Sequence, residues 1–245
     1  MKKWNLLVTG GSGLLGGELR RLLPDASFPT SKEFNVTDYP RMDAYVREKG
    51  YSAVLHAAAF TSPPRIDKDP MSALEVNIVG SANVVKLCIN HGMKFIYVST
   101  DYVFKGDKGG YAEEDEVHPV NKYAWSKLGG ECAARLYDNS LIIRTTFGPN
   151  VFPFEKAFTD QWTSRECVRA TARKIAALAQ EADLTGILHI GGGRKTVMEY
   201  AQSLDPARDI KPLSIKDVAF RVPVDTSLDT RKYQTLFEKP GEKKP

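Results

Sequence analysis

Two residues four positions apart, Tyr123 and Lys127, could together move a proton. They fall in the segment YAWSKLGGECAARLY, which predicts a helix, so that the phenol and the ammonium would share one face. A free phenol, with a pKa of about 10, exchanges protons poorly near neutrality. An ammonium held close by favours the phenolate and would bring the pKa of Tyr123 toward the working range. Most Tyr-x-x-x-Lys pairs are only exposed helix neighbours, so the surrounding sequence must decide.

Hydroxyl groups end the apolar run that precedes this helix. Residues 95–98 predict a buried strand, and Ser99, Thr100 and Asp101 follow it directly. A hydroxyl of Thr100 or Ser99 could hold a substrate oxygen against Tyr123. We therefore expect the chemistry to lie within residues 94–131.

A glycine-rich turn near the amino terminus has the context of a dinucleotide site. Residues 5–9 predict a strand, Gly10-x-x-Gly13-x-x-Gly16 follows, and residues 18–23 predict a helix that ends before Pro24. Glycines allow a tight turn and a close approach of the backbone to a pyrophosphate, which sits on the free N–H groups of the next helix. The alternative, a purely structural turn, is less consistent with this order of elements.

The end of the next predicted strand, residues 26–28, should meet the adenosine ribose of such a ligand. It carries Thr30, Ser31 and Lys32, and basic or hydroxyl groups there favour a 2′-phosphate and hence NADP over NAD. Glu33 is close enough in sequence to bind the 2′-hydroxyl of the ribose, so NAD remains an alternative cofactor. Asp38 ends a further short strand and could cap the helix expected over residues 39–49 or face the adenine, which are compatible roles.

Small residues follow the strand predicted over residues 51–55. Ala57, Ala58 and Ala59 would let a flat cofactor lie against the backbone. A lone histidine such as His56 is more often structural, and we assign it no catalytic role. A loop over residues 61–69 then leads to a long helix over residues 71–90, in which Asn77 is either exposed or bonded to a carbonyl of the active-site strand.

Strands alternating with helices from residue 5 to residue 146 predict an α/β fold with a parallel sheet and helices on both faces. We expect a dinucleotide-binding domain over residues 1–149. Residues 150–238 should form a small substrate-binding or lid region, interleaved with the end of the sheet, and residues 239–245 a flexible tail. In the second region we expect a loop over 151–163, helices over 165–181 and 196–204, and a strand over 187–190. Arg221 could pair with an anionic substrate or be an ordinary surface arginine.

Composition and charge narrow the functional class. The chain has 245 residues, 42% of them apolar and 26% charged, with a net charge of +4, which is ordinary for a soluble globular protein. Its basic residues are scattered, so we expect no nucleic-acid surface. The three cysteines lack the spacing of a disulfide framework or a metal site. We expect no signal peptide, no membrane span and no metal, and a cytoplasmic location.

Four ordered motifs together resemble those of the extended short-chain dehydrogenase/reductases. They are Thr9-Gly-Gly-Ser-Gly-Leu-Leu-Gly16, His56-Ala-Ala-Ala-Phe-Thr61, Ser99-Thr-Asp-Tyr-Val-Phe104 and Asn121-Lys-Tyr-Ala-Trp-Ser-Lys127. The chain is most similar to the dTDP-4-dehydrorhamnose reductase family, over residues 5–147 and again in later segments. That resemblance implies a Rossmann-type doubly wound sheet, NADPH with NADH as the alternative cofactor, and reduction of a 4-keto group on a nucleotide-linked 6-deoxysugar.

The resemblance also implies roles for single residues. Thr100 would orient the keto oxygen, Tyr123 would protonate it, and Lys127 would lower the pKa of Tyr123 and bind the nicotinamide ribose. The cofactor would further contact Gly10, Ser12, Gly13, Leu14, Leu15, Asp38, Ala57, Ala58, Ala59 and Thr61. Tyr102 and Phe104 would border the sugar, together with Thr61, Phe147 and Arg221.

Two departures from the family affect the sugar-nucleotide pocket. The chain is shorter than the family usually is, between Pro149 and Asp160, and it has Phe147 where the family commonly has tryptophan. Two alternatives therefore stay open. One is an epimerase or reductase of another sugar nucleotide. The other is a non-catalytic NADP-binding subunit, like the regulatory subunit of methionine adenosyltransferase. A homodimer is compatible with either.

Overall fold

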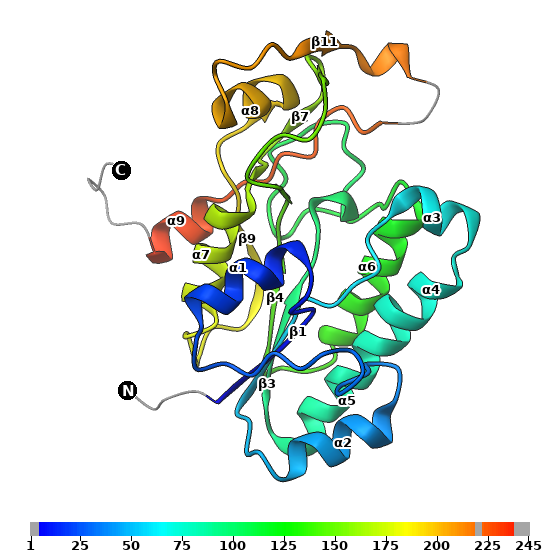
Figure 1. Cartoon of the computed structure of the whole chain (residues 1–245), viewed down its shortest axis with the longest axis vertical. Helices are drawn as coiled ribbons and strands as arrows, with labels where there is room; N and C mark the ends of the chain where they lie inside the picture. The colour runs from blue at the N-terminus through cyan, green and yellow to red at the C-terminus, as the bar shows by residue number, and fades with distance from the viewer. Residues whose placement is uncertain (1–4, 219–221, 238–245) are drawn as a thin grey trace.

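A five-stranded parallel sheet forms the centre of the computed structural model, which describes residues 5–218 and 222–237 (Figure 1). Its strands are β1 (Leu6–Thr9), β2 (Ala53–His56), β3 (Lys94–Val98), β4 (Ser140–Arg144) and β9 (Gly186–His189), in the order β1-β2-β3-β4-β9. All four neighbouring pairs are parallel, with registers such as Leu6↔Ala53 and Phe95↔Ser140. Parallel strands are buried on both faces, which is why these segments are almost continuously apolar. The predicted α/β class is confirmed.

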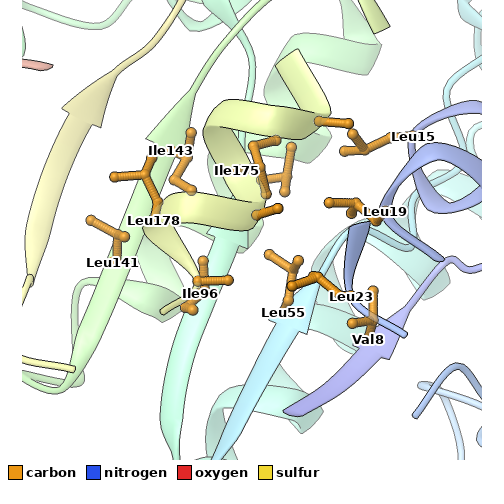
Figure 2. Close-up of a cluster of buried hydrophobic side chains, with 14 of the residues drawn as sticks. Val8, Leu15, Leu19, Leu23, Leu55, Ile96, Leu141, Ile143, Ile175 and Leu178 are labelled. Atoms are coloured by element: carbon orange, nitrogen blue, oxygen red, sulfur yellow. The ribbon is translucent and has the colours of Figure 1, made fainter. Parts of the chain in front are cut away.

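One face of the sheet is covered by α1 (Leu14–Leu22), α7 (Val168–Leu178) and α9 (Arg231–Phe237). Figure 2 shows the layer between them: Leu15 and Leu19 of α1 and Ile175 and Leu178 of α7 lie over strand side chains such as Leu55. Because α7 comes from the carboxyl-terminal half of the chain, that half contributes directly to the dinucleotide-type core.

The other face is covered by α2 (Tyr39–Arg47), α5 (Ser81–His91) and α6 (Lys122–Ala134), which are drawn in blue, cyan and green in Figure 1. Their apolar residues, including Met42, Val85 and Ala134, pack on the opposite side of the same strands. Helices on both faces give the doubly wound arrangement.

The helix expected over residues 71–90 is a run of three pieces: α4 (Met71–Ala73), the π-helix η1 (Leu74–Gly80) and α5. A π-helical turn is rare and is often found at functional sites. This run is long and apolar enough to cross a membrane by length and composition alone, contrary to the sequence-based expectation, although the core helix of a soluble protein passes the same test. Here the run packs along α2 and α6, as a layer of the fold.

A smaller cluster of elements lies beyond the carboxyl ends of the strands, at the top of Figure 1. It contains α8 (Val197–Leu204), β6 (Lys156–Phe158), β7 (Trp162–Thr163), β10 (Lys195–Thr196) and β11 (Lys211–Leu213). Its own core is formed by Phe152, Ala157, Val197, Tyr200, Ala201 and Ile210. Two short strands, β5 (Phe147–Gly148) and β8 (Glu166–Cys167), join this cluster to the end of β4 and the start of α7.

Several expected elements differ from those observed. The strand expected over residues 26–28 is reduced to an isolated bridge between Ser27 and Leu7, and no strand precedes Asp38. The segments expected as loops contain α3 (Pro63–Lys68) and the strands β6 and β7, because Pro at the first helical positions starts a helix readily and short strands need a partner that local sequence does not reveal. The helix expected from residue 165 begins only at Val168, after β8.

Candidate active site

A cavity of about 480 Å³ opens at the carboxyl ends of the strands, where ligands bind in open α/β sheets. Its wall is contributed by the turn after β1, the segments after β2, β3 and β4, and helix α6. The lining residues are Gly10, Gly13, Leu14, Leu15, Gly16, Ala57, Ala59, Thr61, Pro63, Val98, Ser99, Thr100, Asp101, Tyr102, Tyr123, Lys127, Thr145, Thr146, Phe147 and Arg165. The structure thus brings together the glycine turn and the Thr100, Tyr123 and Lys127 set predicted from the sequence.

The glycine turn is built for close backbone approach. Gly10 has a φ of 78°, and a Cβ atom there would lie 2.7 Å from the backbone of Ala57. A Cβ on Gly16 would collide with the carbonyl oxygen of Gly10, so helix α1 can pack onto the turn only with glycine at this position. Leu14 and Leu15 open the helix and line the cavity, as expected for a pyrophosphate cradle.

Helix α6 positions the tyrosine and the lysine. It starts at an Asn121 cap, whose side chain accepts a hydrogen bond from the backbone N–H of Ala124 (2.8 Å). Tyr123 and Lys127 lie one turn apart on the face that lines the cavity. The Lys127 ammonium lies 4.2 Å from the centre of the Tyr97 ring, and only 3% of the residue is exposed.

Thr100 faces the tyrosine from the end of β3. Its Oγ1 accepts a hydrogen bond from the N–H of Tyr102 (3.2 Å) and donates one to Oδ1 of Asp101 (3.1 Å). The Thr100 hydroxyl also favours the phenolate of Tyr123 and acts to lower the pKa of that phenol. The three groups named from sequence therefore meet at one point of the cavity.

The electrostatics of this set differ from the sequence-based expectation. Burial raises the pKa of Tyr123 above its ordinary value, the Asp101 charge raises it further, and only the Thr100 hydroxyl opposes them. Burial also lowers the pKa of Lys127 to about 7, against a smaller opposing effect of Glu131. The lowered phenol pKa expected from the Tyr-Lys pair is thus absent from the protein by itself, because burial dominates the pKa of Tyr123 and Lys127 is not among the groups that shift it.

A buried ion pair between Glu131 of α6 and Arg144 of β4 was missed in the sequence. Glu131 accepts hydrogen bonds from Arg144 Nε (3.2 Å) and from Ser99 Oγ (2.9 Å), and neither Glu131 nor Arg144 is more than 1% exposed. The pair ties α6 to the ends of β3 and β4. The available signal was spacing, because Glu131 lies four residues after Lys127 on the same helix.

Asp101 is a second buried carboxyl group at the cavity. Its Oδ2 accepts a hydrogen bond from the Thr226 hydroxyl (2.6 Å), and only 2% of the residue is exposed. Burial raises the pKa of Asp101 to about 6, while the Thr226 hydroxyl and the Arg165 charge act in the opposite direction. This contact joins the end of β3 to the carboxyl-terminal segment.

The residues expected near the adenosine lie outside the cavity wall. Thr30, Ser31 and Lys32 are exposed, and both the N–H and the hydroxyl of Thr30 donate to the Glu33 carboxylate at 2.8 Å. Asp38 caps α2 by accepting a hydrogen bond from Arg41 N (3.2 Å), which confirms its capping role. Ser12 and Ala58 flank lining residues without lining the wall themselves.

An arginine missed in the sequence lies at the glycine turn. The Arg20 guanidinium stacks on Phe28, 4.6 Å from the ring centre, and a Cβ on Gly11 would lie 3.0 Å from its terminal nitrogen. Arg20 follows Gly16 by one helical turn, which was the available signal. The Arg20 guanidinium therefore lies between the glycine turn after β1 and Phe28.

The expected substrate residues divide into three groups. Thr61, Tyr102 and Phe147 line the cavity. Phe104 does not: it is fully buried, stacked on Tyr111 with ring centres 4.4 Å apart. Arg221 lies outside the described residues.

Two polar residues inside the fold are structural. His56 is buried between the hydroxyls of Thr9 (2.7 Å) and Ser81 (3.0 Å), and burial lowers its pKa to about 3, so its polar atoms are satisfied within the fold. Asn77 in η1 is buried and bonds both the N–H (2.7 Å) and the carbonyl (2.9 Å) of Phe60, in the segment after β2. Over residues 5–218 and 222–237, no group of three or more His, Cys, Asp or Glu side chains could hold a metal ion.

Comparison with known proteins identifies a family match over residues 4–152, to the RmlD substrate binding domain. A dTDP-4-dehydrorhamnose reductase of Aggregatibacter actinomycetemcomitans is 32% identical over 75% of this chain, which spans 65% of that relative's length. The methionine adenosyltransferase 2 subunit beta of Xenopus laevis is also 32% identical, over 94% of this chain and 81% of its own.

Solved structures show the same fold. A hypothetical dTDP-4-dehydrorhamnose reductase from Sulfolobus tokodaii has a TM-score of 0.85 at 28% identity, covering 98% of this chain and 97% of its own. A dTDP-4-dehydrorhamnose reductase from Bacillus anthracis, solved in complex with NADP, has a TM-score of 0.85 at 24% identity, covering 97% and 93%. The part of the chain that the structure describes, including its smaller second cluster, thus follows a known arrangement.

Proposed function

Because the chain belongs to the family of the RmlD substrate binding domain, we propose that it reduces the 4-keto group of a nucleotide-linked 6-deoxysugar with NADPH. One observation carries the proposal: Thr100, Tyr123 and Lys127 converge in a cavity that begins at a glycine turn. A keto sugar placed against Thr100 and Tyr123 would lie beside a cofactor extended from that turn.

The residues present fit a nicotinamide dinucleotide. Gly10 and Gly16 leave the space that a side chain would fill, and Leu14 and Leu15 begin the helix on which a pyrophosphate would rest. Arg20 is placed to contact a 2′-phosphate, which favours NADPH over NADH, and the Glu33 carboxylate is engaged by Thr30. When bound, this cofactor supplies the hydride.

The side chains of the chain then orient the ketone and move the proton. Thr100 turns its hydroxyl from Asp101 to the keto oxygen, and Tyr123 donates the phenolic proton to that oxygen as negative charge develops there. Lys127 binds the nicotinamide ribose and, in its charged form, stabilises the phenolate that remains. Tyr102, Phe147 and Thr61 form the wall around the sugar.

The organisation of the chain follows from this proposal. Residues 1–149 bind the dinucleotide, and residues 150–238 contribute the substrate region as well as α7 and β9 of the sheet. The tail expected over residues 239–245 lies outside the described residues. The enzyme works in the cytoplasm, where NADPH and nucleotide sugars occur. Its partner is the nucleotide sugar.

A direct test is NADPH oxidation by the purified protein, with dTDP-4-dehydrorhamnose and its UDP- and GDP-linked relatives as substrates and NADH as the control cofactor. We expect turnover with one of these keto sugars, and Tyr123→Phe should lower kcat by about 10²- to 10⁴-fold. NADPH binding, followed by its fluorescence, should be nearly unchanged in this variant. A fully active Tyr123→Phe enzyme would refute the mechanism.

A second candidate is a non-catalytic NADP-binding subunit of the methionine adenosyltransferase beta type. It is favoured by the alignment with the Xenopus laevis subunit, which covers more of both chains than the alignment with the bacterial reductase. Stoichiometric co-purification with a methionine adenosyltransferase, without oxidation of NADPH by any keto sugar, would support it. Steady turnover with one substrate would exclude it, and inversion of a sugar centre without net NADPH consumption would instead indicate an epimerase.

A further inference from the structure

Two buried polar atoms at one end of the cavity have no hydrogen-bond partner within the described part of the chain. Thr145 is only 2% exposed, lines the cavity and leaves its Oγ1 without a hydrogen bond. Arg165 lines the same wall, and its buried Nε also has no partner. Unpaired buried polar groups are costly, so two of them at one cavity wall indicate a ligand that bonds to both.

The charge of Arg165 is not compensated by a carboxylate. Among the described residues none lies within ion-pair distance of its guanidinium. Asp101, the carboxyl group whose pKa it influences, is engaged by the hydroxyls of Thr100 and Thr226. Arg165 also lowers the pKa of Tyr102 through its charge and a hydrogen bond, while burial dominates that phenol. A partly buried guanidinium of this kind is suited to an anion with two acceptor oxygens.

The position of the pair in the fold separates it from the cofactor phosphates. The glycine turn follows β1, whereas Thr145 follows β4, three strands away in the sheet order. Neighbouring strands are about 4.8 Å apart, which places roughly 14 Å between the two ends of the cavity. Between them lie Thr100 and Tyr123, where the sugar would react. An anion at Thr145 and Arg165 would therefore lie on the far side of the reacting sugar from the cofactor pyrophosphate.

We propose that Thr145 and Arg165 form the subsite that binds the diphosphate of the nucleotide-sugar substrate. This inference rests on the proposed function and names two residues that the sequence motifs did not include. The guanidinium binds phosphate oxygens through two N–H groups, and the Thr145 hydroxyl donates to a further oxygen. Thr145 directly follows β4 and Arg165 directly precedes β8, and the β5–β8 pairing holds the two segments side by side.

The test measures binding of nucleoside diphosphates to the NADP⁺-loaded protein by titration calorimetry. The probes are dTDP, UDP and thymidine, which lacks phosphate. The variants are Arg165→Met, Thr145→Val and the control Arg173→Met, which changes an exposed arginine on α7. We expect Arg165→Met to weaken dTDP binding by about 10- to 100-fold and Thr145→Val by about 5-fold, with thymidine and the control unaffected.

Three results would overturn the inference. The first is unchanged dTDP affinity in Arg165→Met, with Thr145→Val unchanged as well. The second is loss of NADP⁺ affinity instead of dTDP affinity, which would assign Arg165 to the cofactor. The third is wild-type protein that binds neither dTDP nor UDP. Because the readout is binding, a protein that holds dTDP through Arg165 but reduces no keto sugar would support this subsite and refute the proposed reductase activity.

Discussion

Replacing Lys127 with methionine should abolish reduction and yet stabilise the fold at neutral and acidic pH. The side chain is almost completely buried, and its ammonium lies over the face of the Tyr97 ring, 4.2 Å from the ring centre. Methionine has a similar length and can occupy the same space without a charge to desolvate. The ammonium that should bind the nicotinamide ribose is lost, so function and stability should change in opposite directions.

The magnitude follows from the pKa of Lys127, which burial lowers from 10.5 to about 7. Below pH 10.5 the unfolded lysine is protonated, while the folded one remains neutral down to about pH 7, so wild-type stability falls as pH falls through this window. At about 1.36 kcal/mol per pKa unit, the full effect is about 5 kcal/mol. Loss of the contact with Tyr97 destabilises the variant by about 0.5–2 kcal/mol. The net gain in its free energy of unfolding at pH 6.5 is therefore about 3–4 kcal/mol.

The assay is urea unfolding of wild type and Lys127→Met without cofactor, at several pH values between 6.5 and 10. The difference between the two free energies of unfolding cancels the titration of all other groups. It should favour the variant at pH 6.5 and shrink toward zero by pH 10. Lys68→Met, which changes an exposed lysine, is the matched control and should show no such trend. A difference independent of pH would refute the reasoning that burial discharges Lys127.

Three further predictions concern the cofactor and the buried charges. Arg20→Gln should raise the KM for NADPH about tenfold and leave the KM for NADH unchanged, and an equal effect on both cofactors would remove Arg20 from the 2′-phosphate. Glu131→Gln should cost about 3–5 kcal/mol in urea unfolding, because the Arg144 charge would stay buried without a partner, and a cost below 1 kcal/mol would contradict this. The folded pKa of Asp101 is raised from 3.8 to about 6, so the contribution of this group to wild-type stability should fall by about 2 kcal/mol as pH rises from 4 to 7. Asp101→Asn should lack this decrease, and a variant with the wild-type pH profile would show that Asp101 is not its source.

The parts of the fold and site that could be predicted depend on local sequence. The glycine turn is a contiguous pattern whose steric need is met at Gly10, and Tyr123 and Lys127 share a helix face because of their spacing. The expected strands that pair in the middle of the sheet are present within a residue or two of their predicted bounds. These features require no knowledge of distant contacts.

The parts that could not be predicted depend on tertiary contacts. Arg165 enters the cavity because β8 pairs with β5, a contact between two-residue strands that carry almost no pattern. Phe104 stacks on Tyr111 and therefore does not line the cavity. The strand expected near Ser27 is reduced to one bridge to Leu7. In each case a partner distant in sequence decides where the residue lies, and neither hydrophobicity nor spacing predicts that partner.

The protonation states of Lys127 and Tyr123 depend on both local sequence and tertiary burial. The Tyr-Lys spacing correctly places an amine near a phenol, but in the protein alone burial discharges the amine and raises the phenol pKa. A dinucleotide brings phosphate charges and ribose hydroxyls to the cavity, and both favour a charged Lys127. The charged lysine then favours the Tyr123 phenolate, as the motif implied. The Tyr-Lys motif therefore describes the cofactor-loaded protein, and the desolvation that opposes it in the free protein is the effect that Lys127→Met would measure.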